Sequence, residues 1–502
     1  MKIIMDTFPK KEIVKENLDN QTVSDNIFGH RFHSDQTLYE YLIEFLLIFV
    51  SVKKFNGINK IGEMRFHNQG EELKYYAEPK MGLKRFIFYD RTKKDKSIPL
   101  DEDAYYLLIN EIKQQLDDEN SEKKVTAIQD LLRGYAVILK KRTWCAQQTL
   151  PLCPELIFNE AMPNQRKRLE KVKKYDTFDI DKYFQFKQRN FLAKGGEIYY
   201  MHLLQAFAND SNSQRKNQLE NLLKKTLIEQ SGNISKIARI IQNTWEGIII
   251  TDNKNTDLYE QYELSYIPEN AYKKCGNYAV DELICYLSND FQHIKKIEIM
   301  AKGVMFQIMR MMYCAVAVYL KIDQKPWIID MTNNTSKTIK KIANNSYRSV
   351  EEDFKQAIDI AASNLSENDN ILKNIKKGQK DSVDIFRSKG KELRCIIPVT
   401  GAYERFTLSE DVLRFLVISL IKPTEKITYE MFLERMYKHY NIVIGPIQYE
   451  KSLKNLNQSE LSIKNSLYEN EIYFQEFLKS TGFLKELSDS TSLVYNPYNS
   501  IE

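Results

Sequence analysis

The chain has 502 residues, enough for about three domains, and its net charge of +5 neither demands nor excludes a nucleic-acid partner. Hydrophobic residues make up 43% and charged residues 28%, which excludes a disordered chain. Only 17 Gly and 12 Pro are present, too few for the frequent turns of propellers, sandwiches and barrels. The composition therefore predicts a mostly α fold of the α+β kind with a multi-helical body.

The cysteines and the apolar segments indicate where the protein is located. None of the six cysteines forms a CxxC pair, and Cys285 and Cys314 lie in apolar stretches typical of buried free thiols. The first residues lack an apolar signal core, and the longest apolar run, at 42–52, contains Glu44 and is too short to span a bilayer. We therefore expect a cytoplasmic protein with no membrane contact, and the abundance of Lys, Asn and Ile is typical of an AT-rich bacterial genome.

Residues 1–150 predict an N-terminal helical domain with a small strand region. Ser34 and Asp35 are suited to cap an apolar helix over 38–52. His30, His33 and Asp35 could share a metal ion, but we favour hydrogen bonds that anchor the helix start, and His67 stands in a similar context. We expect no bound metal or cofactor.

Residues 151–331 predict a central helical domain that contains the most basic stretch of the chain. Residues 165–194 hold ten Lys or Arg against four Asp or Glu, interleaved with Tyr and Phe. Cations can contact phosphates and aromatic rings can stack on unpaired bases. The other interpretation is a solvated helix face followed by core aromatic residues. The candidate nucleic-acid-binding residues are Arg166, Lys167, Arg168, Lys171, Lys173, Lys174, Lys187 and Arg189.

Two segments of the central domain have weaker binding signals. Gly195 and Gly196 could cradle a phosphate at a helix start, but they lack the P-loop lysine, so an ordinary turn is favoured. Residues 219–241 are similar to a helix-turn-helix, although the apolar, strand-like segment 243–253 leaves little room for a recognition helix.

Candidate nuclease carboxylates are Asp281, Glu282, Asp290, Glu298 with Lys302, and Asp330, and Cys145 with His202 is a candidate nucleophile pair. Glu298 and Lys302 have helical spacing and so fail the Glu-x-Lys pattern of restriction-type nucleases, and Asp330 has no such strand nearby. Nothing beyond composition supports Cys145 and His202 as a nucleophile pair. No complete catalytic motif is present, and the catalytic residues stay unknown.

Residues 332–393 predict a polar linker with one helix, and residues 394–502 predict a separate domain. Thr407 with Glu410 has capping-box spacing, Thr428 can start a second helix, and Asn441 can end it. A third helix over 469–482 and a strand–turn–strand follow. Three helices before a two-stranded ribbon resemble a winged helix, a class that binds DNA or docks proteins.

The charge of this winged-helix-like domain favours protein docking or a scaffold role over DNA contact. Residues 388–502 hold 14 Lys or Arg against 15 Asp or Glu. The third helix carries Glu469, Glu471 and Glu476 against Lys479 alone, and acidic side chains repel phosphates. We expect a chain without residues 396–502 to stay soluble and to lose a protein partner.

Two segments resemble large components of bacterial multigene anti-phage defence systems. They are GHRFHSDQTLYEYLIEFLL at 29–47 and the C-terminal series VIGP, GFLKELSDS and NPY. The resemblance implies a non-catalytic DNA-associated or scaffold subunit of a multi-protein complex. Its partners would be other subunits of the same operon, such as an ATPase, a nuclease or a methyltransferase, with DNA as a further candidate. The alternative is a nuclease or other nucleic-acid enzyme with an unrecognised active site.

Overall fold

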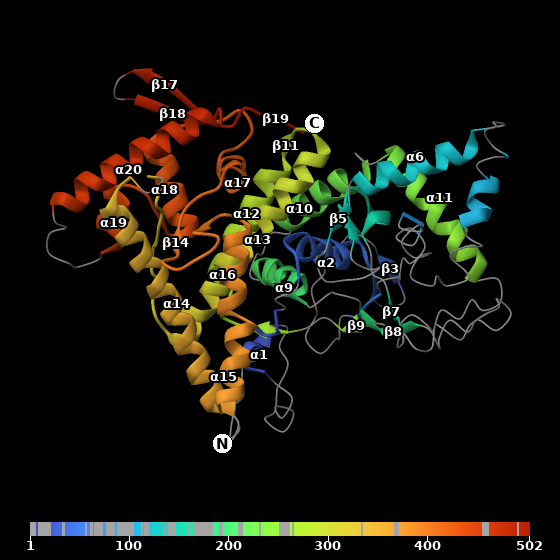
Figure 1. The fold of residues 1–502 in the computed structure, drawn as a ribbon, viewed down its shortest axis with the longest axis horizontal. Coiled ribbons are helices and arrows are strands. Elements are labelled where there is room, and N and C mark those ends of the chain that lie inside the picture. The colour runs from blue at the N-terminus through green and yellow to red at the C-terminus, as the bar shows by residue number, and fades with distance from the viewer. Residues whose placement is uncertain are drawn as a thin grey trace.

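The computed structural model of the chain is mostly helical, with small sheets beside the helices (Figure 1). This agrees with the fold class expected from composition. The structure describes residues 7–8, 22–32, 36–55, 58–60, 64, 74–76, 86–87, 105–111, 114, 120–134, 136–138, 147–157, 161–163, 184–189, 194–208, 214–229, 232–249, 262–263, 266–332, 335–365, 371–453, 461–488 and 491–501.

The N-terminal half combines helices with short antiparallel strand pairs. Its helices are α1 (Val23–Phe28), α2 (Leu38–Val50), α6 (Ser121–Gly134), η2 (Pro154–Leu156), α9 (Gly195–Ala208), α10 (Gln214–Lys224), η4 (Lys225–Glu229) and α11 (Gly232–Ile249). Its strands are β1 (Thr7–Phe8), β2 (Val52–Phe55), β3 (Ile58–Lys60), β4 (Lys74–Tyr76), β5 (Ala136–Ile138), β6 (Gln147–Thr149), β7 (Ala161–Pro163), β8 (Phe184–Arg189), β9 (Tyr262–Glu263) and β10 (Ile267–Pro268). Strands β3, β2, β4 and β9 form a four-stranded sheet in that order.

Helix α2 starts three residues after the predicted caps. Thr37 is its N-cap: the Thr37 Oγ1 atom accepts from the Glu40 backbone N–H, and the Glu40 carboxylate accepts from the Thr37 N–H at 2.6 Å. Ser34 and Asp35, which the sequence offered as caps, lie outside the described residues. A capping box with Glu at the third helical position satisfies two backbone donors, whereas a lone cap satisfies one.

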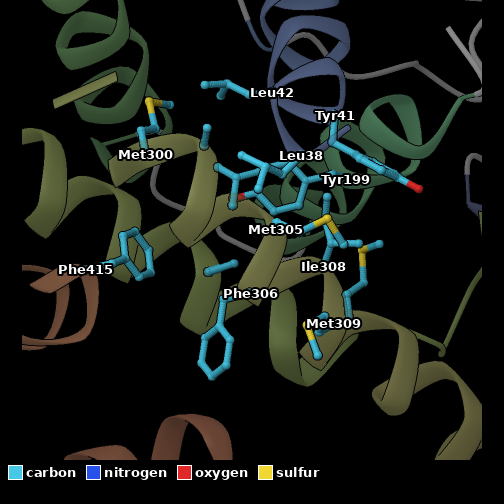
Figure 2. Packing of buried hydrophobic residues seen from close by; sticks show 14 of the residues in the cluster. Leu38, Tyr41, Leu42, Tyr199, Met300, Met305, Phe306, Ile308, Met309 and Phe415 are labelled. Atoms are coloured by element: carbon cyan, nitrogen blue, oxygen red, sulfur yellow. The ribbon is translucent and has the colours of Figure 1, made fainter. Parts of the chain in front are cut away.

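The core is built around α13 (His293–Leu320), which follows α12 (Lys273–Leu287) and the short β11 (Asn289–Asp290). Figure 2 shows Met305 and Ile308 of α13 beside Leu38 of α2 and Tyr199 of α9, with Phe415 approaching from another side. Among the described helices, α13 alone is long and apolar enough to cross a membrane, and 83% of its apolar window is buried. Its burial is that of a core helix.

Residues 332–393 differ from the predicted linker with one helix. Three packed helices lie there: α14 (Lys337–Leu365), α15 (Ile371–Lys380) and α16 (Val383–Glu392). Helix α14 buries Ile339, Ala343, Tyr347, Val350, Phe354, Ile358 and Ala361 along one face. This apolar stripe at three- and four-residue spacing is the signal that the many Asn, Lys and Ser residues obscured.

In its described residues the C-terminal segment begins with two short strands and continues with four helices, with single strands between the first three helices and three strands at the end. The elements are β13 (Ile396–Ile397), β14 (Arg405–Phe406), α17 (Glu410–Leu420), β15 (Lys426–Thr428), α18 (Tyr429–Tyr440), β16 (Ile442–Val443), α19 (Pro446–Ser452), α20 (Leu461–Ser480), β17 (Leu484–Ser488), β18 (Thr491–Tyr495) and β19 (Asn499–Ser500). Strands β15, β18 and β17 form an antiparallel sheet in that order.

Two of the predicted helix signals in this segment are confirmed and one is wrong. Thr428 caps α18, and Asn441 ends it with a left-handed φ of 56°. Ser409 is the N-cap residue of α17, and the Thr407 hydroxyl instead donates to the Asp330 carbonyl at 2.8 Å. The predicted third helix starts earlier, because α20 begins at Leu461.

The C-terminal segment shares its core with the centre of the chain. Strand β16 pairs in parallel with β12 (Trp327–Ile328), and β19 pairs with β11. Helix α17 packs on α12 and α13, where a Cβ atom at Gly303 would collide with the Phe415 ring. Removing residues 396–502 would therefore open the central core to water.

Candidate functional site

Most of the predicted basic tract lies outside the described residues. Arg166, Lys167, Arg168, Lys171, Lys173 and Lys174 are among these. Lys187 and Arg189 belong to β8, which pairs with β7 through Arg189 and Ala161. The tract stays a prediction.

A second lysine-rich segment is exposed on α15. Its four lysines, Lys373, Lys376, Lys377 and Lys380, stand at positions i, i+3, i+4 and i+7, so they share one helix face. All four side chains are exposed, and α15 contains no acidic residue. We call these four residues the lysine face. At 1.5 Å per residue it is about 10 Å long, which spans roughly three phosphates of one DNA strand.

The opposite side of α15 packs against the core, and this packing keeps the lysine face turned toward solvent. Ile371 and Ile375 pack against the hydrophobic core, and Gly378 is buried. A Cβ atom at Gly378 would lie 2.9 Å from side-chain atoms of Ile358 in α14 and Val23 in α1. Because the contact is this close, only glycine fits at residue 378. The packing of Gly378 against α1 and α14 fixes the rotation of α15 about its own axis.

Carboxylates that follow α15 are already paired with other cations. Asp381 is buried and lies 2.6 Å from Arg31, and Asp384 lies 3.5 Å from Arg387. No ion pair among the residues that the structure describes involves a lysine of this face. Within the described part of the chain, the four charges are therefore open to an anionic ligand.

A face whose chemistry differs from that of the lysine face lies on α20, which contains the predicted third helix. Leu467, Asn470, Phe474 and Leu478 point inward. The Asn470 side chain donates to the carbonyls of Ile329 and Ile444, both at 2.9 Å, and accepts from the Met331 N–H. These three hydrogen bonds fix which side of α20 faces outward.

The outward side of α20 is apolar and acidic. Tyr468 and Ile472, one helical turn apart, are 55% and 58% exposed, and Glu469 and Glu476 are exposed beside them. Glu471 is partly buried, and burial together with the nearby Glu430 raises its pKa to about 7. We call Tyr468, Glu469, Ile472 and Glu476 the α20 face.

A buried charge network ties α12, α13 and α18 together. The carboxylate of Glu282 accepts from Arg310 at 2.7 Å, from Gln307 at 2.6 Å and from the Tyr440 hydroxyl at 2.5 Å, and His439 Nδ1 lies 2.8 Å away. Burial alone would raise the pKa of Glu282, but Arg310 and His439 outweigh it and hold the pKa below its usual value. With every carboxylate oxygen engaged and the carboxylate buried, this network is structural.

The phosphate cradle at Gly195 and Gly196, the alternative to the favoured ordinary turn, gains no support from the structure. The Glu44 carboxylate accepts from the backbone N–H groups of Lys194 at 2.9 Å and Gly196 at 2.7 Å. Both glycines lie against Tyr41 of α2, where a Cβ atom would collide. The glycines thus serve close packing of α9 on α2, and a protein carboxylate occupies the helix start.

The histidines form no metal cluster within the described ranges. His30 Nδ1 accepts from the Arg31 N–H at 2.7 Å, and His33, Asp35 and His67 lie outside those ranges. No group of three His, Cys, Asp or Glu side chains with metal-binding geometry is found where the structure is described.

The residues weighed as catalytic have structural partners. Lys302 pairs with Asp411, Glu298 pairs with Lys295 at 3.1 Å, and Asp330 accepts from Arg405 at 2.6 Å. These pairs join α13 to α17 and the end of β12 to β14.

The candidate thiol–histidine pair gains no support. His202 is buried between the rings of Tyr199 and Tyr272, and burial lowers its pKa to about 3. Cys145 lies outside the described residues. The described cysteines are free thiols; Cys314 is buried as predicted, and Cys285 is only partly buried.

The lysine face was missed because residues 332–393 were interpreted by composition. The sequence ILKNIKKGQK already places Ile371, Ile375 and Gly378 on one side of a helix and the lysines on the other. No family model, curated protein sequence or solved structure matches the chain.

Proposed function

We propose that this chain is a non-catalytic, DNA-associated subunit of a cytoplasmic bacterial multi-protein complex, of the kind that acts in anti-phage defence. The observation that carries the DNA contact is the lysine face of α15: four exposed cations on one helix face, with no ion pair to any residue that the structure describes. Lysine ammonium groups bind phosphates as point charges, and phosphate contacts carry no base information, so this contact should be independent of sequence.

The C-terminal segment supports the same proposal. The strand order β15, β18, β17 and the series α17, β15, α18, α20, β17, β18 resemble a winged helix, a class found in DNA-associated complexes, with β16 and α19 inserted between α18 and α20. The acidic α20 face opposes phosphate contact through α20, which contains the predicted third helix. We therefore assign the DNA contact to the lysine face and to the predicted tract at 166–194, and a protein-docking role to the winged-helix-like segment.

The lysine face is tested by DNA binding at several salt concentrations. In the variant K373Q/K376Q/K377Q/K380Q the slope of log K against log salt should flatten by about 2 to 3, because each lost phosphate contact removes about 0.9. The matched control is K422Q/K426Q/K438Q/K485Q, which removes four exposed lysines elsewhere and leaves the same net charge. Equal slopes in the two variants would show that only net charge matters and would overturn the proposal.

The same titration separates the other assignments. The quadruple charge reversal of Arg166, Lys167, Arg168 and Lys171 to Glu should also weaken binding to all sequences alike. Incubation of the wild-type protein with DNA and Mg²⁺ or Mn²⁺ should leave the DNA intact. Cleavage would contradict the non-catalytic assignment and favour a nuclease.

A further inference from the structure

The α20 face exposes two large apolar side chains on one helix of the C-terminal segment. Tyr468 and Ile472 stand at i and i+4, where two large side chains form one continuous patch. Exposed apolar patches rimmed by polar groups mark interaction sites. Since Asn470 locks the inner side by three hydrogen bonds, the patch cannot be buried by a rotation of α20 within this fold.

The charges around the patch are negative once internal pairs are taken into account. The two lysines of α20 are neutralised, Lys464 by Glu450 and Lys479 by Glu486 at 2.9 Å. Glu469 and Glu476 have no partner among the ion pairs of the described residues, and both are exposed. A ligand of this face must therefore bring apolar side chains and positive charge together.

Neighbouring elements extend the same chemistry. The Glu471 side chain packs against Gly445 at the start of α19, and the Tyr429 hydroxyl of α18 donates to the Glu471 carbonyl at 3.4 Å. Next to these contacts, Met431 and Ile447 are 48% and 51% exposed. Helices α18 and α19, which contact α20, thus each carry one further exposed apolar side chain.

We propose that the α20 face docks a cationic amphipathic helix of another subunit, with leucine-like side chains on Tyr468 and Ile472 and lysine or arginine opposite Glu469 and Glu476. This inference rests on the proposed function, because it names the kind of partner within the complex. An amphipathic helix laid along α20 offers apolar anchors at the same i, i+4 spacing, and its flanking cations meet the glutamates.

The test uses the full-length protein and a labelled 18-residue peptide of leucine and lysine with leucines at i, i+3, i+4 and i+7. The wild-type protein should bind the peptide, and Y468S/I472S should weaken binding at least about 10-fold because the apolar anchors are lost. E469Q/E476Q should weaken binding less and should remove most of its salt dependence. The matched control L372S/L487S, at positions 75% and 58% exposed elsewhere, should bind as the wild-type protein does.

Three results would overturn the inference. The first is that the wild-type protein does not bind the peptide, and the second is that Y468S/I472S binds it as well as the control does. The third is that the wild-type protein self-associates in sedimentation and Y468S/I472S does not, because the face would then bind a second copy of the chain. DNA binding is measured on the same variants and should not change, so a failed DNA contact is distinguished from a failed docking face.

Discussion

The lysine face and the α20 face lie near opposite ends of one long helix and have opposite chemistry. Helix α14 packs against α20 and against α15, and its 29 residues make it about 44 Å long (Figure 1). The lysine face has four cations and no carboxylate, and the α20 face has two exposed carboxylates beside Tyr468 and Ile472. One face suits a phosphate backbone, and the other suits a basic, apolar partner.

The two faces are held in similar ways, which shows where binding chemistry is encoded. Gly378 fixes α15 through close packing, and Asn470 fixes α20 through three buried hydrogen bonds. In both helices the outward residues contribute little to the core, and exposed substitutions usually change stability by less than about 0.5 kcal/mol. The inward residues therefore determine the fold, and the outward residues can serve ligands.

The largest effect is expected from removal of residues 396–502, which deletes α20 and leaves the lysine face of α15 on a chain that has lost part of its core. Phe415 and the rest of α17 pack on α12 and α13, and β16 pairs with β12. We expect the truncated chain to be insoluble, in contrast to the expectation from sequence alone. The measurement is the soluble fraction after expression, and a soluble, folded truncation would show that α12 and α13 are stable without this cover.

A large effect is also expected from the buried Glu282 network, which joins the C-terminal α18 to the central helices. Arg310→Met leaves the buried Glu282 carboxylate without its cation and should lower the free energy of unfolding by about 3 to 5 kcal/mol. The measurement is urea unfolding at pH 7. The control E282M/R310M removes both charges and should lose less; an equal or greater loss in this double variant would contradict the charge argument.

Local signals predicted the C-terminal segment well. The Thr428 cap and the left-handed Asn441 are set by a few neighbouring residues, so sequence reasoning finds them. The Thr407 cap failed because its hydroxyl bonds to Asp330, which is 77 residues away. No local pattern reports such a contact.

The candidate surfaces were predicted less well than the secondary structure. The glutamates of α20 were found, but the exposure of Tyr468 and Ile472 depends on the buried partners of Asn470, which directly follow β12 and β16. The glycine pair at 195–196 has the pattern of an anion site, and only the fold brings Glu44 to it. In each case the deciding contact joins residues far apart in sequence.

The smallest expected effect is a pH dependence of stability caused by Glu471, and it should arise on the α20 side and not on the lysine face. The pKa of Glu471 is raised to about 7 by burial and by Glu430, above the ordinary value of 4.5. Between these two pH values the folded chain holds a proton that the unfolded chain releases, so the free energy of unfolding should fall as pH rises from about 4.5 to about 7. The Glu471→Gln variant lacks this pH dependence. Its free energy of unfolding, relative to that of the wild-type protein, should therefore rise between pH 4.5 and pH 8. Since Glu471 is partly exposed, we expect this rise to be only about 1 to 2 kcal/mol. Urea midpoints at pH 4.5, 6 and 8 measure the difference, and Glu469→Gln, at an exposed position on the same helix, should stay within about 0.5 kcal/mol of the wild-type protein throughout. A difference between Glu471→Gln and the wild-type protein that does not change with pH would show that Glu471 is ionised alike in the folded and unfolded chains.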